Sequence, residues 1–388
     1  MRPRSGLGRS IRPGSTARRK AAARGPAAAV RVLEGARLGP RSTLGVGGPA
    51  RFLAEALTEA DVHEAAALAD ERGLPLLVLG QGSNVVVADR GVEAVVISMG
   101  LRGLRVETTD AGFLVTAAAG EPWDPLVAHA VTSGWAGLEC LSGIPGLVGA
   151  TPIQNVGAYG QDVGAVVTAV RALDREPGRV VTLAPSECAF TYRDSAFKRR
   201  PGRWVVLGVT YQLSPGGPPA VRYAELSAHL MSQGLDRPTV HDVRQAVLQV
   251  RRTKSMVLAH DDPNARSCGS FFLNPRVAAA ERERIADAAG DRSMPAWPEG
   301  DGRVKLSAAW LIERAGFRRG EHDGPVGLST RHALAIVTHT GAQATDVVRF
   351  ARRLQEGVVA RFGVRLVPEP VFWGFDHLTD GLPSEPAA

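Results

Sequence analysis

Two short apolar runs flank a glycine loop in the stretch Leu74-Pro-Leu-Leu-Val-Leu-Gly80-Gln-Gly-Ser-Asn84-Val-Val-Val87. Runs of this length, bounded by turn residues, are typical of buried strands. Glycines let a backbone approach a ligand closely, and the N–H groups of such a turn can bind an anion. We therefore predict a phosphate-binding loop made of Gly80, Gln81, Gly82, Ser83 and Asn84. A plain tight β-turn is the alternative that these residues alone leave open.

The loop carries neither of the common nucleotide-binding signatures. No G-x-G-x-x-G opens a helix after the first strand, because a second strand follows instead. No Gly-Lys-Ser/Thr sequence is present either. The chain therefore offers a candidate phosphate site without a Rossmann or Walker motif.

The neighbouring sequence mixes helical and strand patterns. A helix is predicted to begin at Thr58, where Asp61 completes a capping pair, and to end at Gly73. Further predicted helices and strands alternate irregularly through the rest of the chain, which indicates the α+β class. The predicted helices are 125–133, one that begins at Thr239, and 347–362; the predicted strands are 74–80, 85–88, 95–98, 113–116 and 204–213.

A second glycine-rich stretch runs from Gly143 to Gly160 and holds five glycines in eighteen residues. Polar side chains alternate with this flexible backbone, an arrangement that suits a large, flat, polar ligand. The candidate contacts in this stretch are Gly146, Gly149, Thr151, Gln154 and Asn155.

The formal net charge of +7 comes from the N-terminus. Residues 1–31 hold eight Arg, one Lys and no acid, which leaves 37 basic and 39 acidic residues in the body. We predict a disordered tail; an organelle transit peptide and a mis-assigned start codon are alternatives. The body lacks the basic excess of a nucleic-acid binder, and no apolar run approaches the length of a membrane span. Cys140, Cys188 and Cys268 show no metal-ligand spacing, so we expect reduced thiols and no metal.

Several spaced motifs carry a resemblance to a known family. They are Phe190-Thr-Tyr-Arg-Asp-Ser195, Arg252-Thr-Lys254, Gly269-Ser-Phe-Phe-Leu-Asn-Pro275, Val304-Lys-Leu-Ser-Ala-Ala-Trp310 and Pro368-Glu-Pro370. Together with the two glycine loops, they resemble the UDP-N-acetylenolpyruvoylglucosamine reductase family. The motifs follow the family's order from about Thr43 to Phe372.

The resemblance implies an α+β fold with an FAD-binding domain of the vanillyl-alcohol-oxidase type in two subdomains, plus a smaller α+β substrate-binding domain. The glycine loops would hold FAD. The expected parts are a tail (1–31), FAD subdomain 1 (32–98), FAD subdomain 2 (99–255), the substrate domain (256–362) and a C-terminal segment that returns to subdomain 2 (363–388).

The resemblance also implies a reaction. NADPH would reduce FAD and leave, and UDP-N-acetylglucosamine enolpyruvate would then be reduced to UDP-N-acetylmuramate for peptidoglycan synthesis. Family roles fall on Arg193 as the catalytic arginine, Ser270 as the proton donor and Glu369 as the catalytic glutamate. We expect a cytoplasmic monomer without a nucleic-acid or membrane partner.

Substrate contacts are implied for Tyr223, Lys254, Asn274 and His332. Tyr223 resembles the tyrosine that covers the substrate diphosphate in the form of the family with that loop. Two positions depart from the family pattern: Leu273 stands where a lysine is common, and His332 where some members carry glutamine. The role of Glu369 stays open between orienting the substrate and relaying a proton.

Two other functions compete with this one. One is a flavin-dependent alcohol or sugar oxidase of the same broad fold, although the Gly-Ser-Phe-Phe and Pro-Glu motifs and the lack of an evident His or Cys flavin tether argue against it. The other is a nucleic-acid or membrane-surface binder that depends on the basic tail.

Removal of residues 1–31 separates the tail from the catalytic body. We expect reductase activity to be unchanged, because the tail is the only strongly basic segment and has no place in the implied chemistry. Steady-state kinetics of the truncated and full chains give the comparison. A large loss of kcat would contradict this view of the tail.

Overall fold

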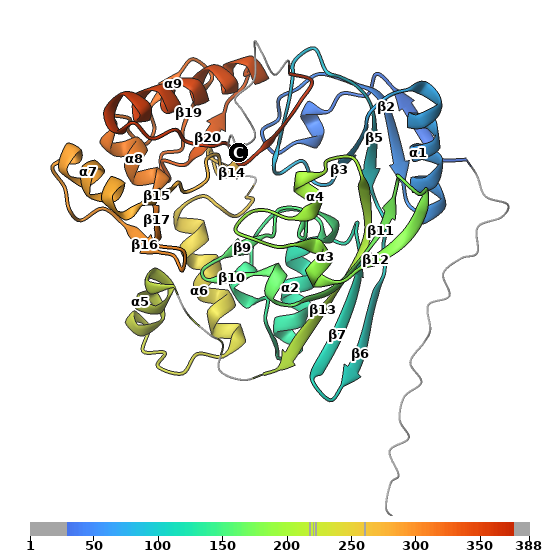
Figure 1. The fold of residues 1–388 in the computed structure, drawn as a ribbon, viewed down its shortest axis with the longest axis horizontal. Helices are drawn as coiled ribbons and strands as arrows, with labels where there is room; N and C mark the ends of the chain where they lie inside the picture. Colours follow the sequence, from blue (N-terminus) through green and yellow to red (C-terminus); the bar gives the residue numbers. More distant parts are fainter. Residues whose placement is uncertain (1–28, 217–218, 220, 222, 260, 376–388) are drawn as a thin grey trace, which may run out of the picture.

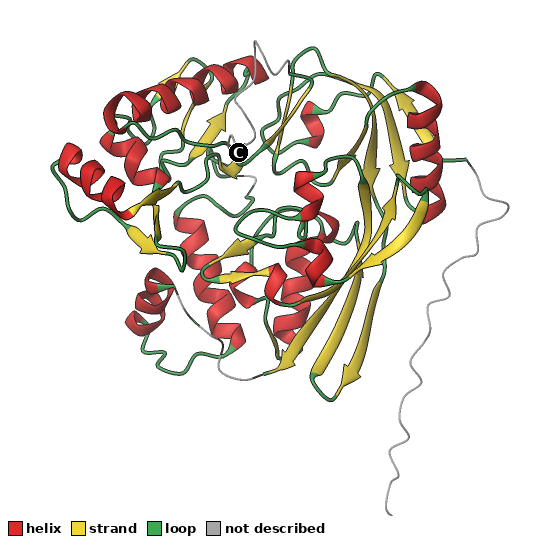
Figure 2. Ribbon diagram, viewed as in Figure 1, coloured by secondary structure: helices red, strands yellow, loops and turns green. Residues whose placement is uncertain are grey.

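The computed structural model describes residues 29–216, 219, 221, 223–259 and 261–375. The predicted disorder of residues 1–31 therefore falls almost entirely outside the described residues. Three groups of strands, each covered by helices, make up the body (Figure 1). The secondary-structure view shows the long strands on one side of the molecule and the largest group of helices on the other (Figure 2).

The first glycine loop, residues 80–84, follows the last strand of the first sheet. The strand order of this sheet is β1 (Arg31–Glu34), β2 (Ala50–Ala56), β5 (Val92–Met99) and β3 (Leu76–Leu79), with β2–β5 and β3–β5 parallel. Helix α1 (Glu59–Arg72) packs on this sheet, and its capping box joins Thr58 and Asp61 as predicted. Gly73 ends the helix at φ +62°, a conformation that glycine adopts without strain.

The second sheet is antiparallel and larger. Its order is β12 (Arg179–Leu183), β11 (Val167–Asp174), β13 (Trp204–Pro215), β7 (Gly112–Ala118) and β6 (Leu104–Thr109), with β8 (Trp135–Ala136) also paired to β13. Helix α2 (Trp123–Thr132) packs beside β8, and α6 (Val240–Thr253) lies beyond it. The segments around the ligand loops are short: β9 (Gly157–Ala158), β10 (Gln161–Asp162), α3 (Pro185–Cys188), α4 (Ala196–Arg199) and α5 (Ala224–Ser232).

The C-terminal part combines two small sheets with three helices. One sheet has the order β14 (Ser267–Ser270), β20 (Ala335–Thr338), β19 (Val326–Leu328) and β18 (His322–Asp323). The other has the order β15 (Arg276–Ala278), β17 (Arg303–Leu306) and β16 (Ala296–Pro298). The helices are α7 (Ala279–Ala289), α8 (Ala308–Arg314) and α9 (Ala344–Phe362). The apolar side of α9 is buried, as its spacing predicts.

The chain end returns to a different place from the one predicted. Strand β21 (Val371–Trp373) pairs in parallel with β4 (Val85–Val87), which lies within the predicted FAD subdomain 1 rather than subdomain 2. Val86 belongs to the same apolar cluster as Phe271 and the α9 core. Burial in this cluster favours the return of the chain end. The pairing favours it too, because β4 has no neighbour in the first sheet and pairs with β21 instead.

Each cysteine is free and buried. Within the described ranges, no helix combines the length and the apolar character that crossing a bilayer requires. The limits predicted for the other parts of the chain stay predictions.

One carboxylate joins the first sheet to the C-terminal helix. Asp89 Oδ1 accepts a hydrogen bond from Ala344 N at 2.7 Å, and its Oδ2 accepts one from Thr345 N at 2.9 Å. These donors belong to the first turn of α9, whose N–H groups have no partner within the helix. Asp89 therefore caps a helix that begins 255 residues later in the chain.

Asp89→Ala is expected to lower the free energy of unfolding by about 1–2 kcal/mol, the usual cost of losing a helix cap. Urea denaturation gives the measurement. Asp110→Ala, which removes an equal charge from an exposed turn, is the control and is expected to change stability little. Equal losses in the two variants would contradict the capping role.

Candidate active site

A cavity of about 720 Å³ lies between the second sheet's loops and the C-terminal part. Its size falls in the range of small-molecule and cofactor sites. It brings together residues that are far apart in the sequence. Six of the predicted catalytic and substrate-binding residues line it: Arg193, Tyr223, Lys254, Ser270, Asn274 and His332.

Arg193 is held in place by the backbone around it. Its Nη1 donates to Asn155 O at 3.4 Å, and its Nη2 donates to Gly157 O. A Cβ on Gly157 would come within 2.9 Å of both Arg193 Nη1 and the backbone oxygen of Gln161, so glycine suits this close approach. Arg193 itself has φ +56°, an uncommon conformation for a residue with a side chain. The guanidinium is thus fixed by two carbonyl groups and retains a side that faces the cavity.

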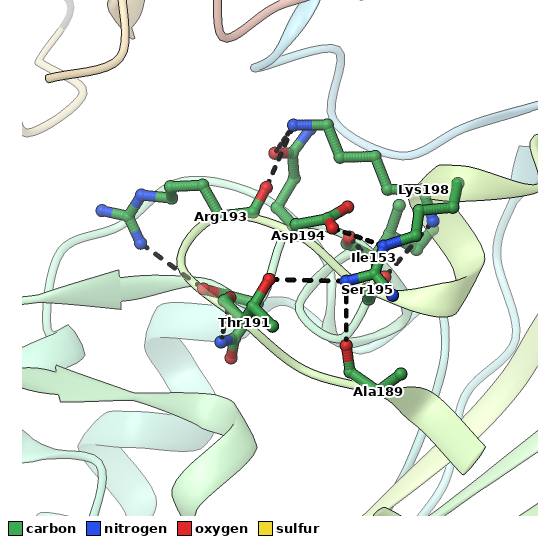
Figure 3. Close-up of polar contacts among 10 residues, drawn as sticks. Ile153, Ala189, Thr191, Arg193, Asp194, Ser195 and Lys198 are labelled. Carbon is green, nitrogen blue, oxygen red and sulfur yellow. Dashed lines mark hydrogen bonds and ion pairs between the residues drawn. The ribbon is translucent and has the colours of Figure 1, made fainter. Parts of the chain in front are cut away.

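The turn that carries Arg193 is tied to the second glycine loop. Ser195 Oγ donates to Ile153 O at 2.8 Å and accepts from Lys198 N, which caps α4. Lys198 Nζ donates to Arg193 O at 3.0 Å. Figure 3 shows the Arg193 side chain extending away from Ser195 and Lys198, which lie on the other side of the turn. Local contacts therefore decide where the guanidinium points.

Glu369 completes a pair with Arg193. Glu369 Oε1 lies 3.5 Å from Arg193 Nε, and the two side chains are only 20% and 22% exposed. Burial raises the pKa of Glu369 above its ordinary value, and the charges of Arg193 and Lys198 oppose that rise. A carboxyl in this position can exchange a proton closer to neutral pH than an exposed glutamate can.

Ser270 ends β14, directly before the residue that bonds to the backbone of Glu369. Ser270 lines the cavity, and Glu369 N donates to the carbonyl of the next residue, Phe271, at 2.9 Å. Arg193 and Ser270 therefore line the cavity, and Glu369, which does not line it, is joined to Arg193 by its side chain and to the residue after Ser270 by its backbone.

The four predicted substrate residues line the same cavity. Lys254 follows the last turn of α6 and pairs with Glu225 at 2.7 Å. Tyr223 precedes α5, and its ring meets that of Tyr159 edge to face at 5.4 Å between centroids. Asn274 Oδ1 accepts from Ala308 N at 3.0 Å. Burial, followed by the charges of Lys254 and Arg319, lowers the pKa of His332 to about 4.

The two glycine loops lie against each other. Gln81 Oε1 accepts from Gly146 N at 2.9 Å, and Ser83 Oγ donates to Pro145 O at 3.4 Å. Gly82 has φ +63°, and a Cβ there would fall 2.2 Å from Arg41 O. Asn84 Nδ2 donates to Glu369 O at 3.3 Å, so the first loop also touches the catalytic segment.

The first loop fits the diphosphate of FAD. Within the described residues, no hydrogen bond starts from the backbone N–H of Gly82, Ser83 or Asn84. Successive N–H groups that stay unpaired in a turn form a nest for an anion. The two loops, joined by Gln81 and Gly146, supply such a nest next to Glu369.

The other predicted cofactor contacts differ in what they offer. Asn155 lines the cavity, but its side chain is engaged with Thr191 O and Gly164 N. Gln154 Oε1 accepts from Lys198 Nζ at 3.5 Å. Thr151 is 3% exposed and its hydroxyl bonds Tyr211 OH at 2.8 Å, so the Thr151 side chain serves the core. Gly149 packs against Ala119, and Gly80 faces Leu147. These two glycines therefore allow the backbone to pack closely against neighbouring residues.

Comparison with known proteins identifies the family. Residues 50–184 match a model described as an FAD binding domain, and residues 261–373 match the C-terminal domain of UDP-N-acetylenolpyruvoylglucosamine reductase. The chain is 45% identical to a protein of that name from Streptomyces coelicolor over 352 residues, which cover 89% of this chain and 91% of the relative. The relative from Thermobifida fusca is 49% identical over 345 residues, or 86% and 95% of the two chains.

The chain belongs to the UDP-N-acetylenolpyruvoylglucosamine reductase family. A solved reductase from Thermus caldophilus superposes with a TM-score of 0.60 at 26% identity and covers 89% of this chain and 98% of its own. The predicted α+β fold with an FAD-binding domain is confirmed, and so is the prediction of an FAD-dependent oxidoreductase.

Several residues that line the cavity were not predicted from the sequence. Arg251 lines the cavity one helical turn before Lys254, and Tyr159 lies beside it. The three-residue spacing of Arg251 and Lys254 on one helix face was a usable signal. Lys305 Nζ lies 4.7 Å from the centre of the Tyr192 ring, and Trp297 adds a second aromatic wall. No local pattern marked Trp297, because the C-terminal part brings it to the cavity, whereas Tyr192 lies within the motif at 190–195.

The lowered pKa of His332 predicts a pH effect on the stability of this reductase. Its folded pKa, about 4, lies below the ordinary value of 6.5, so the unfolded chain binds more protons between these pH values. His332 should therefore destabilise the fold progressively as pH falls from 6.5 to 4, whereas glutamine cannot titrate. We expect wild type to lose up to about 2 kcal/mol relative to His332→Gln across this window.

Urea denaturation at pH 7, 5.5 and 4.5 tests the difference between the two proteins. His63→Gln, at an exposed position of α1, is the control and should show no such divergence. Stability curves for wild type and His332→Gln that stay parallel would contradict the assignment.

Proposed function

We propose that this protein reduces UDP-N-acetylglucosamine enolpyruvate to UDP-N-acetylmuramate, with NADPH as the electron donor, for peptidoglycan synthesis. One observation carries the proposal. Arg193 and Ser270 line a nucleotide-sized cavity, and Glu369 pairs with Arg193 and bonds to the residue after Ser270, next to glycine loops that fit FAD. Bound FAD would take a hydride from NADPH and deliver it to the substrate's double bond, and the protein's residues would do the rest.

Arg193 suits the charge that develops in this reaction. Addition of hydride to the terminal carbon of the enolpyruvyl group builds negative charge that spreads into the neighbouring carboxylate. A fixed guanidinium stabilises such charge far better in a partly dry cavity than in water. Because Asn155 O and Gly157 O already hold Arg193, little reorganisation is needed when the charge appears.

Protonation of the adjacent carbon requires a donor in the same place. The Ser270 hydroxyl is a weak acid, yet a carbanion is a strong base and the hydroxyl needs only correct placement. The raised pKa of Glu369 and its position next to Ser270 support a part in moving or orienting that proton. Both of the roles considered for Glu369 remain compatible with this geometry.

The remaining cavity residues suit a nucleotide diphosphate. Lys254 supplies a charge, while Tyr223 and Asn274 supply neutral polar groups. Neutral at physiological pH because of its low pKa, His332 can donate one hydrogen bond and accept another. A cytoplasmic location and a monomeric state complete the proposal.

Stopped-flow absorbance of the purified protein tests the proposal directly. We expect a yellow protein whose flavin is bleached by NADPH and recovers its colour when UDP-N-acetylglucosamine enolpyruvate is added. A colourless protein without FAD would rule the proposal out. Bleaching of the flavin by a simple alcohol or sugar, with recovery of its colour on addition of oxygen but not of the enolpyruvyl nucleotide, would favour the oxidase alternative.

Ser270→Ala is expected to separate the two half-reactions. Reduction of the flavin by NADPH should stay nearly unchanged, because it needs no proton from Ser270. Reoxidation by the enolpyruvyl nucleotide should slow by about 10²–10⁴-fold, as for loss of a general acid. Single-turnover rates measure both steps, and Ser267→Ala on the same strand is the control. Equal slowing of both steps would contradict the proton-donor role.

A further inference from the structure

We propose that Asp124, on helix α2 and outside the cavity, is a positioning residue for substrate binding. Through Arg244 it holds α6, and with it Arg251 and Lys254, against the start of the second glycine loop. The inference rests on the proposed function, since it concerns binding of the enolpyruvyl nucleotide in the same cavity.

Asp124 makes three hydrogen bonds that join three segments. Its Oδ1 accepts from Arg244 Nη1 at 2.7 Å and its Oδ2 from Arg244 Nη2 at 2.9 Å, a two-pronged pairing with α6. Oδ1 also accepts from Gly143 N at 2.6 Å. Burial alone would raise the pKa of Asp124, but the Arg244 and Gly143 donors outweigh it and lower that pKa. The carboxylate is therefore ionised and fully engaged at neutral pH.

Gly143 is held from both sides by this arrangement. Its N–H reaches Asp124, and its carbonyl accepts from Arg251 Nη2 at 3.3 Å. Gly143 has φ +71°, and a Cβ there would come within 2.8 Å of Leu248 Cδ2, so the loop lies flush against α6. The loop and the helix thus share one close-packed contact, which opposes movement of α6 relative to the loop.

Arg251 carries the contact into the cavity. It lies seven residues after Arg244, two helical turns along the same face. Arg251 Nη2 also donates to Met256 O at 2.6 Å, which fixes the chain just after Lys254. Both Arg251 and Lys254 line the cavity. Displacement of α6 by even about 1 Å would misplace both cations relative to a bound diphosphate.

The protein contains a matched pair that lacks this connection. Asp174 accepts from Arg203 Nε at 3.3 Å and Nη2 at 3.0 Å, and from Glu176 N at 3.2 Å. Like Asp124, this carboxylate accepts two hydrogen bonds from one arginine and one from a backbone N–H. Its pKa is also lowered. It lies at the end of β11, and none of its partners lines the cavity. Asp174 therefore reports what loss of such a pair does to stability alone.

Asp124→Asn and Asp174→Asn, each purified with FAD, give the test. We expect Asp124→Asn to raise the KM for UDP-N-acetylglucosamine enolpyruvate by about ten-fold while kcat changes by less than about three-fold. Asp174→Asn should leave KM within about two-fold of wild type, although its melting temperature should fall as much as that of Asp124→Asn. The same KM in both variants would overturn the inference.

Arg244→Lys guards against a variant that fails to fold, because it keeps the charge and loses only the two-pronged pairing. We expect it to raise KM in the same direction; an unchanged KM would count against the inference. In the double variant Asp124→Asn/Arg244→Lys, KM should rise no further than in Asp124→Asn, since both act through one contact. If wild type does not turn over the enolpyruvyl nucleotide, the proposed function fails; if wild type does and Asp124→Asn resembles Asp174→Asn, only this inference fails.

Discussion

The parallel pairing of β21 with β4 is the contact on which the geometry of the active site depends. Val371 N donates to Asn84 O at 3.0 Å, directly after the first glycine loop. Two residues before Val371, the carbonyl of Glu369 accepts a hydrogen bond from Nδ2 of the same Asn84. On its other side, Glu369 N donates to Phe271 O. A chain end that would otherwise be unconnected is thereby placed between the FAD loops and the strand that carries Ser270.

The electrostatics of the site follow from that placement. Glu369 is buried by the return of the chain, which raises its pKa, and its nearest cation is Arg193. Removing either partner would leave the other charge buried and poorly compensated. Arg193 has additional support from the carbonyl groups of Asn155 and Gly157, so its position does not depend on Glu369 alone. The hydrogen bonds that hold this part of the fold together therefore also position Arg193 and Glu369 for the reaction.

Helix α6 connects the cavity to the scaffold in a different way. Its buried face packs with α5 and with Cys140, and its last residues reach the cavity. Its polar anchors, Arg244 and Arg251, both lead to Gly143 at the start of the second glycine loop. The loop expected to hold the cofactor and the helix expected to hold the substrate are thus parts of one packed unit.

Much of the local structure could be predicted from the sequence. The capping pair at Thr58 and Asp61, the glycine end at Gly73 and the spacing of the α9 apolar face each depend on residues within one element. The strand ends on either side of the glycine loop follow from composition in the same way. Such features are set by near neighbours, so a pattern in the chain is enough to indicate them.

Tertiary structure decided which of the candidate residues meet. The motifs around Arg193, Ser270 and Glu369 identified the family, but their contact requires a return of the chain that was expected on the second subdomain and occurs on β4. Thr151 looked like a polar ligand contact, yet Tyr211 draws its hydroxyl into the core. Trp297 and Asp124 had no local mark of importance. Their roles depend on long-range packing, which local sequence patterns do not reveal. The environment of each side chain is formed by segments that are far away in the sequence.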